Sequence, residues 1–134
     1  MMNKTGLTFL LILISVAAFA TGYTYERNVP YRENAGDEYI SKMCRLDIAY
    51  QPDVQNAPVV VWFHGGGLTG GSREVPSGLL TDGMIVVGVE YRLSPHVETM
   101  EIVDDAAAAV AWVFDNIGKY GGDTSSIYIA CLLY

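Results

Sequence analysis

Cysteine, histidine and basic residues are scarce in this sequence of 134 residues. It contains two cysteines, two histidines, and 8 lysines and arginines against 15 aspartates and glutamates. Two cysteines allow at most one disulfide, and we expect free thiols at Cys44, in a strand-like segment, and at Cys131, near the end of the chain. The formal net charge of −7 argues against nucleic acid or an anionic membrane as a partner, because either favours a basic patch.

The first twenty residues have the pattern of a secretory signal peptide. Lys4 provides the positive region, residues 7–14 are apolar, and Ala-Phe-Ala at 18–20 is a small-x-small cleavage site. A helix over residues 7–20 would span about 21 Å, which is short of the roughly 30 Å of bilayer hydrocarbon. We therefore predict cleavage after Ala20, a secreted or periplasmic location and no stable membrane anchor. Residues 21–134 are long enough for one domain.

Hydrophobic patterns after the predicted cleavage site indicate strands. Residues 45–50 alternate, as in a half-buried antiparallel edge strand. Residues 59–63 and 84–89 are continuous apolar runs rich in β-branched side chains, which is typical of central strands of a parallel sheet. Residues 126–130 begin another buried strand. Residues 23–36 have no period, so we expect a surface arm there.

A helix is predicted between the last two strands. Its apolar residues recur at spacings of three and four, and they are Val103, Ala107, Val110, Phe114 and Ile117. The pattern covers residues 102–117 and is followed by Gly118, where a left-handed cap is favoured. Strands that alternate with a helix in this way indicate an α/β domain with a mostly parallel sheet and flanking helices.

A glycine-rich loop, residues 65–72, follows the strand at 59–63. Glycines at the carboxyl end of a buried strand let the backbone approach a ligand closely and direct N–H groups at negative charge. A dinucleotide loop is one alternative, because Gly65, Gly67 and Gly70 satisfy G-x-G-x-x-G. That site requires a helix that opens on the glycines, and residues 71–83 are too rich in proline and glycine to form a full one.

Two further kinds of site fit the loop to different degrees. A P-loop needs a lysine where this chain has Gly71. An oxyanion hole needs only preorganised backbone N–H groups, which explains three consecutive glycines, Gly65, Gly66 and Gly67. In that arrangement His64 would support the loop through hydrogen bonds and would not be the catalytic base. A plain flexible turn remains the alternative without function.

Four ordered segments together resemble one family. They are His-Gly-Gly-Gly at 64–67, Tyr-Arg-Leu-Ser-Pro at 91–95, the Asp-Asp and alanine-rich run at 104–112, and Tyr-Gly-Gly-Asp at 120–123. The sequence resembles the bacterial carboxylesterases related to hormone-sensitive lipase, in the branch with feruloyl- and acetyl-esterase-like proteins, over roughly residues 44–130. His-Gly-Gly-Gly is the oxyanion-loop signature of lipases and esterases of the α/β-hydrolase fold.

The resemblance implies an incomplete α/β-hydrolase fold with half of a catalytic site. It places the oxyanion hole at Gly66 and Gly67, with Gly65 adjacent, and the nucleophile on a G-x-S-x-G turn directly after the strand at 126–130. This sequence continues instead as Cys-Leu-Leu-Tyr at 131–134. The triad order in this fold is serine, acid, histidine, so all three members would lie beyond residue 134. We expect an N-terminal fragment without esterase turnover of its own.

Other polar residues are weaker candidates. Ser72 beside His64, and Ser94 beside His96, lie on no G-x-S-x-G turn, so we expect surface hydroxyls and loop histidines. The three aspartates of the resembling segments, Asp104, Asp105 and Asp123, are expected to start a helix or cap turns.

The expected activity of the parent enzyme is hydrolysis of a carboxylic ester through an acyl-serine intermediate, without metal or cofactor. The partner would be a small-molecule or polysaccharide-linked ester. The alternative from another class is a non-catalytic α/β module that binds a ligand or a partner. The strand at 126–130 argues against this alternative. In a stand-alone module it would be left as an exposed apolar sheet edge, which invites aggregation.

Overall fold

The computed structural model describes residues 22–33, 36–81 and 83–132, so the predicted signal peptide lies outside the described part. One five-stranded sheet in the order β1-β2-β4-β3-β5 organises the chain. β1 and β2 are antiparallel to their neighbours, and β4, β3 and β5 are parallel. The strands are β1 (Thr24–Pro30), β2 (Arg45–Tyr50), β3 (Ala57–Phe63), β4 (Ile85–Val89) and β5 (Gly122–Cys131).

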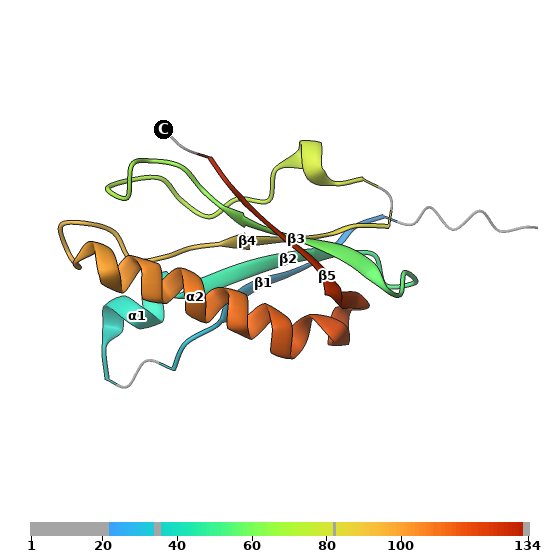
Figure 1. Ribbon diagram of the computed structural model, residues 1–134, viewed down its shortest axis with the longest axis horizontal. Helices are drawn as coiled ribbons and strands as arrows, with labels where there is room; N and C mark the ends of the chain where they lie inside the picture. The colour runs from blue at the N-terminus through green and yellow to red at the C-terminus, as the bar shows by residue number, and fades with distance from the viewer. Residues whose placement is uncertain (1–21, 34–35, 82, 133–134) are drawn as a thin grey trace, which may run out of the picture.

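Helices cover one face of the sheet. α1 (Glu38–Met43) and α2 (Thr99–Asn116) lie below it in Figure 1, and the connection from β3 to β4, with the short 3-10 helix η1 (Ser77–Leu79), lies above it. Right-handed crossovers explain this division. The step from β3 to β4 and the step from β4 back past β3 to β5 run in opposite directions, so their connections lie on opposite faces.

The central strands agree with the hydrophobic pattern. β3 and β4 pair in parallel from Val59 opposite Ile85 to Phe63 opposite Val89, and all five residues of β4 are buried. Strands that carry aliphatic side chains on both faces are stable only when both faces are covered. The α/β class and the mostly parallel sheet predicted from the sequence are therefore confirmed.

The N-terminal part differs from the sequence-based expectation. Residues 24–30, expected within a surface arm, form β1, which pairs with β2 through a bulge between Glu26 and Val29. β2 is consequently an inner strand, and its four central residues are buried, so the expectation of a half-buried edge strand was wrong. Cys44 ends α1 and does not lie in a strand. The described structure has free thiols at Cys44 and Cys131, as expected.

α2 is longer than its pattern suggested and packs through another face. Reciprocal hydrogen bonds between Glu98 and Glu101 cap its start, and the 3-10 helix η2 (Ile117–Tyr120) follows its end. The left-handed residue after these helices is Gly121, with φ of 84°, and not Gly118. The buried face consists of Ile102, Asp105, Ala109 and Val113.

The predicted apolar face of α2 is largely open. Val103 is 52% exposed and Phe114 is 51% exposed. Together with Phe63, Leu68, Val110 and Ile129 they line the apolar α2–β5 groove, a cavity of about 700 Å³ between the helix and the last strand. α2 therefore carries two apolar faces, and only one of them packs on the sheet.

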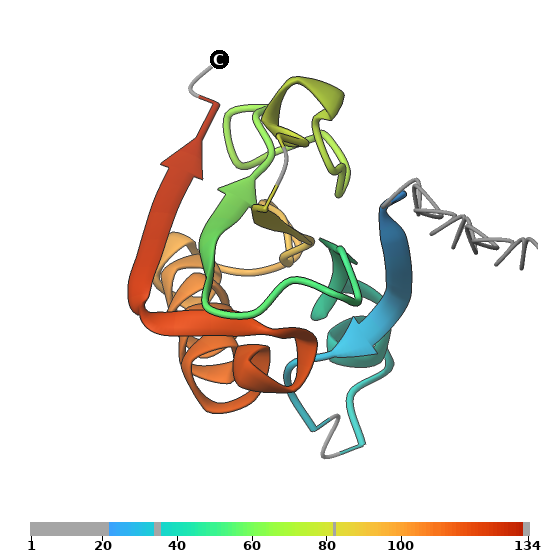
Figure 2. The same ribbon diagram turned by 90° about the vertical axis from the view of Figure 1, so that its right-hand side faces the viewer.

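β5 forms an edge of the sheet. Figure 2 shows it at the opposite side of the sheet from β1. It pairs with β3 along one side, and Tyr128 and Ile129 are 59% and 62% exposed.

Within the described part of the chain, no helix is long and apolar enough to cross a membrane.

Candidate functional site

The glycine loop begins where β3 ends, at the carboxyl edge of the parallel strands. Gly66, Gly67 and Leu68 have φ values of 124°, 61° and 63°, so the backbone turns through the left-handed region at three successive residues. The turn is closed by the carbonyl oxygen of Gly66, which accepts from the amides of Thr69 and Gly70, each at 3.1 Å. Positive φ is readily available to glycine, and this explains the sequence Gly-Gly at 66–67.

Close packing of the loop also requires missing side chains. A Cβ atom on Gly66 would lie 2.2 Å from the carbonyl oxygen of Gly70. One on Gly71, whose φ is 95°, would lie 2.2 Å from the carbonyl oxygen of Gly65 and 2.4 Å from Nδ1 of His64. Gly70 has no heavy atom within 4 Å of such a position. Gly66 and Gly71 are therefore fixed by sterics, while Gly70 is not.

His64 is buried beneath the loop and fully engaged. Its Nδ1 lies 2.8 Å from the carbonyl oxygen of Gly65, and its Nε2 lies 2.8 Å from Oε1 of Glu90. The ring stacks on Tyr91, with ring centroids 4.3 Å apart and planes 7° apart. Burial alone would lower the pKa of His64, but the bonds to Glu90 and Gly65 and the charges of Glu90 and Glu74 raise it overall.

Glu90 connects His64 to the chain that leaves the loop. Its second carboxylate oxygen accepts from the amide of Arg73 at 2.9 Å. Burial alone would raise the pKa of Glu90, but the hydrogen bonds from His64 and Arg73, and their charges, lower it overall. The carboxylate is therefore ionised and bridges the two ends of the glycine loop.

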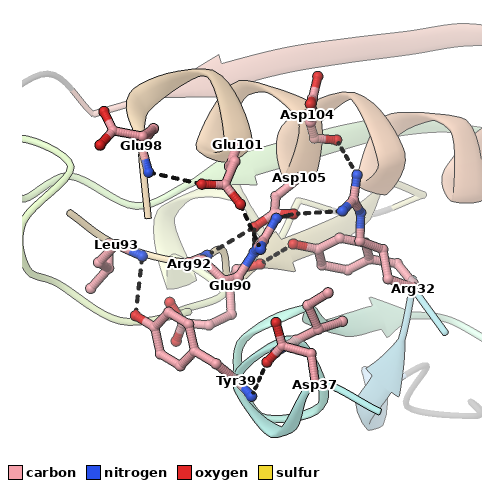
Figure 3. A network of polar contacts seen from close by, with 12 residues as sticks. Arg32, Asp37, Tyr39, Glu90, Arg92, Leu93, Glu98, Glu101, Asp104 and Asp105 are labelled. Carbon is pink, nitrogen blue, oxygen red and sulfur yellow. Dashed lines mark hydrogen bonds and ion pairs between the residues drawn. The ribbon is translucent and has the colours of Figure 1, made fainter. Parts of the chain in front are cut away.

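Tyr91 fastens the end of β4 to His64, and Arg92 fastens it to α2. Burial raises the pKa of Tyr91 to about 12, and its hydroxyl donates to the carbonyl of His64 at 2.6 Å. Arg92 donates to Asp105 through Nε at 2.8 Å and through Nη2 at 2.9 Å (Figure 3). Asp105 is fully buried, and Arg32 also lies 3.3 Å from it.

This role of Asp105 was not predicted from the sequence. Asp105 does not start α2, which begins at Thr99, but ties the middle of the helix to Arg92. Asp104, its neighbour, is exposed. Asp123 does cap a turn, as expected, because it accepts from the amide of Ser125 at 2.8 Å. Burial inside a helix cannot be seen from Asp-Asp alone, although an arginine just after a buried strand is a signal for a carboxylate partner.

The loop leaves backbone donors unused beside a cavity. The amides of Gly66 and Gly67 donate to no acceptor among the described residues. His64, Gly65, Gly66 and Gly71 line a cavity of about 270 Å³ together with Ser72, Glu74 and Leu132. The last described residue of the lining, Leu132, is held to β3 by its amide, 3.2 Å from the carbonyl oxygen of Phe63. The described end of the chain after β5 therefore lies directly beside the glycine loop.

The other candidates do not form a second site in the described residues. The ring nitrogens of His64 contact Gly65 and Glu90 and not Ser72. The ring of His96 packs against the ring of Tyr39, with the two centroids 5.3 Å apart. No helix opens on the glycines, since η1 is a single turn that starts at Ser77, so the dinucleotide alternative lacks the helix it requires. The described ranges contain no group of three potential metal ligands.

Comparisons with known proteins agree with this geometry. The family model described as BD-FAE matches residues 46–131. Esterase LipC of Mycobacterium tuberculosis is 29% identical over 81% of this chain and 27% of its own length. Carboxylesterase NlhH of the same organism is 39% identical over 60% of this chain and 28% of its own. The chain thus spans little more than a quarter of either relative.

Solved structures share the same architecture. An esterase from Pyrobaculum calidifontis matches with a TM-score of 0.60 and 38% identity over 65% of this chain and 30% of its own. The strand order, the glycine loop at the end of β3 and the family match all point to one group of enzymes. The chain belongs to the BD-FAE family and carries part of an α/β-hydrolase fold similar to the carboxylesterases related to hormone-sensitive lipase.

Proposed function

We propose that this chain is the N-terminal part of a secreted carboxylic ester hydrolase and that it supplies the oxyanion half of the catalytic site. Gly66 and Gly67 would donate their amides to the oxygen of the ester carbonyl as it becomes negative, with Gly65 adjacent and His64 as support. The serine, acid and histidine would come from chain that follows β5. The observation that carries the proposal is the unpaired amide of Gly66, which lines the cavity at the end of β3, followed directly by the unpaired amide of Gly67.

Donors fixed before the reaction are effective because they need no reorganisation when charge develops. Each preorganised donor in such a hole contributes on the order of 3 kcal/mol to stabilisation of the transition state. The positive φ values of Gly66 and Gly67 and the turn closed by Gly66 fix the peptide planes in this loop. Such a loop binds through its backbone alone, which fits a role in stabilising charge and not in proton transfer.

The charge around the cavity favours a neutral ligand. Glu74 lines the cavity, while the charge of Glu90 is offset by its ion pair with His64. The negative charge of Glu74 raises the cost of binding a permanently anionic ligand such as a pyrophosphate. An ester carbonyl is neutral in the ground state and negative only in the transition state, so it gains from the amides without this repulsion on binding.

The α2–β5 groove supports the proposal that further chain completes the domain. A right-handed crossover that continues outward past β5 places its helix on the same face as α2. That face carries the exposed apolar stripe of Val103 and Phe114, and the free edge of β5 lies beside it. Burying a large aliphatic or aromatic side chain there is worth about 1.5–3 kcal/mol.

Secretion is part of the same proposal and rests on the sequence of residues 1–20. A precursor of the full length and a mature product that starts at residue 21 would support it. N-terminal sequencing of the exported protein tests this point. An N-terminus at Met1 in the exported protein would contradict it.

A turnover assay tests the catalytic part of the proposal. The purified 134-residue chain should give no saturable hydrolysis of p-nitrophenyl butyrate, whereas the product of the complete reading frame should hydrolyse it. In that product Gly66→Ala should lower kcat by roughly 100-fold, because the added Cβ would clash with the carbonyl oxygen of Gly70 and displace the amide donor. Gly70→Ala is the matched control, because space is available at that position. Saturable turnover by the 134-residue chain, or equal activity of both variants, would contradict the proposal.

A further inference from the structure

We propose that Glu90 and His64 lock the oxyanion loop, because Glu90 holds His64 doubly protonated and His64 in turn holds the peptide between Gly65 and Gly66 in one orientation. This inference rests on the function proposed above, since it concerns the amide of Gly66. Both residues are positioning residues that act through the loop backbone.

The geometry of the ring requires two protons. Nδ1 faces a carbonyl oxygen at 2.8 Å and Nε2 faces a carboxylate oxygen at 2.8 Å, and both of these atoms are acceptors. A neutral imidazole has one N–H, so it could satisfy only one of the two contacts and would place a lone pair against the other oxygen. The imidazolium donates to both. The contacts therefore favour the imidazolium, which has no free lone pair with which to act as a general base.

The hydrogen bond to Gly65 fixes the direction of the next amide. In a trans peptide the C=O and the following N–H point in opposite directions. Because the C=O of Gly65 points at Nδ1 of His64, the N–H of Gly66 points away from the ring. Both residues of this peptide are glycines, so a flip would meet little steric resistance from side chains. The bond from His64 opposes the flip in addition to the turn closed by Gly66.

Charged groups around His64 maintain the cation. Glu90 comes from the end of β4, and Glu74 from the connection on the other side, and both favour the charged ring. Tyr91 stacks on the ring and keeps its hydroxyl proton for the carbonyl of His64. Arg73 is the nearby cation, and its guanidinium is engaged 3.0 Å from Asp47 while its amide orients Glu90.

Loss of the second proton would release the lock. The remaining proton stays on Nε2, opposite the negative Glu90, so Nδ1 presents a lone pair to the carbonyl oxygen of Gly65. Repulsion between these atoms favours the flipped peptide, in which the amide of Gly66 no longer serves the cavity. The oxyanion hole is therefore expected to work below the pKa of His64 and to fail above it.

Nitrogen-15 NMR of the intact chain tests the lock directly. The chain has only two histidines, and His96→Gln identifies the signal of His64. At pH 6.5, the ordinary histidine pKa, more than half of His64 should be imidazolium, with both ring nitrogens protonated. A neutral His64 at that pH overturns the proposal, and this measurement needs no variant of Glu90.

Replacement of Glu90 separates the lock from simple packing. Glu90→Gln should shift the titration of His64 to lower pH and, with it, the pH at which the amide signal of Gly66 changes. Glu38→Gln, at an exposed position on α1, is the matched control and should shift neither. An unchanged His64 titration in Glu90→Gln overturns the proposal. Because protonation is read without turnover, a failure here is distinct from a failure of the esterase assay.

Discussion

The contact between Asp105 and Arg92 should be the most costly polar contact to break in the described structure. Asp105 is fully buried and Arg92 is 5% exposed, and they share two charged hydrogen bonds of 2.8 and 2.9 Å. Asp105→Ala would leave a buried guanidinium with only the longer contact to Glu101 at 3.3 Å. Removing one partner of a buried ion pair costs about 3–5 kcal/mol.

That loss is large for a chain of this size. A small domain is stable by roughly 5–15 kcal/mol in total. Urea unfolding, followed by far-UV circular dichroism, measures the change in the free energy of unfolding. Asp104→Ala is the matched control, one position earlier on the same helix and exposed, and should change it by less than about 0.5 kcal/mol. Similar losses of stability in the two variants would contradict a dominant role of this ion pair.

Three further outcomes follow from the loop, the ion pair and the sheet edge. Gly66→Ala should destabilise the chain by about 1–3 kcal/mol in urea unfolding, because φ is 124° and Cβ would lie 2.2 Å from the carbonyl oxygen of Gly70; a value below that for Gly70→Ala would contradict this. The His64–Glu90 pair should stabilise most between the ordinary pKa values of 4.5 and 6.5. Its contribution should be lost as pH rises through the raised pKa of His64 or falls through the lowered pKa of Glu90, and a difference between wild type and Glu90→Gln that does not vary with pH would oppose this. Ile129→Lys should increase the monomer fraction in light scattering, because charge on an exposed edge opposes sheet pairing, and unchanged aggregation would count against it.

The central strands and the glycine loop were predictable from local sequence. β3 and β4 are buried on both faces, so their composition alone indicates their place in the sheet. The loop was predictable because consecutive glycines directly after a buried strand indicate a backbone that turns sharply or approaches a ligand closely. The match to the BD-FAE family agrees with the resemblance carried by these segments.

The elements that the sequence did not reveal depend on contacts distant along the chain. β1 has six exposed residues out of seven and forms because β2 offers it a pairing edge, so no hydrophobic period marks it. The face of α2 was assigned wrongly because the helix has two apolar faces. Asp105 lies on the buried face of α2, so a charged residue interrupts the hydrophobic pattern of that face. Its burial is explained by the ion pair with Arg92, which the sequence does not reveal.

The buried arrangement of His64 and Glu90 also required the fold. The residues are 26 positions apart and meet because β3 and β4 are parallel neighbours that end at the same edge of the sheet. The sequence alone predicts that His64 supports the loop, but it does not identify Glu90 as the partner of His64.

Under the proposed function, this chain supplies the oxyanion half of an esterase site whose nucleophile follows β5. The most direct test is to read the gene through the codon for Ala130 and to translate every frame downstream. We expect codons for a Gly-x-Ser-x-Gly turn directly after β5, followed by later aspartate or glutamate and histidine codons. A stop codon after Tyr134, with no such turn in any frame, would contradict it.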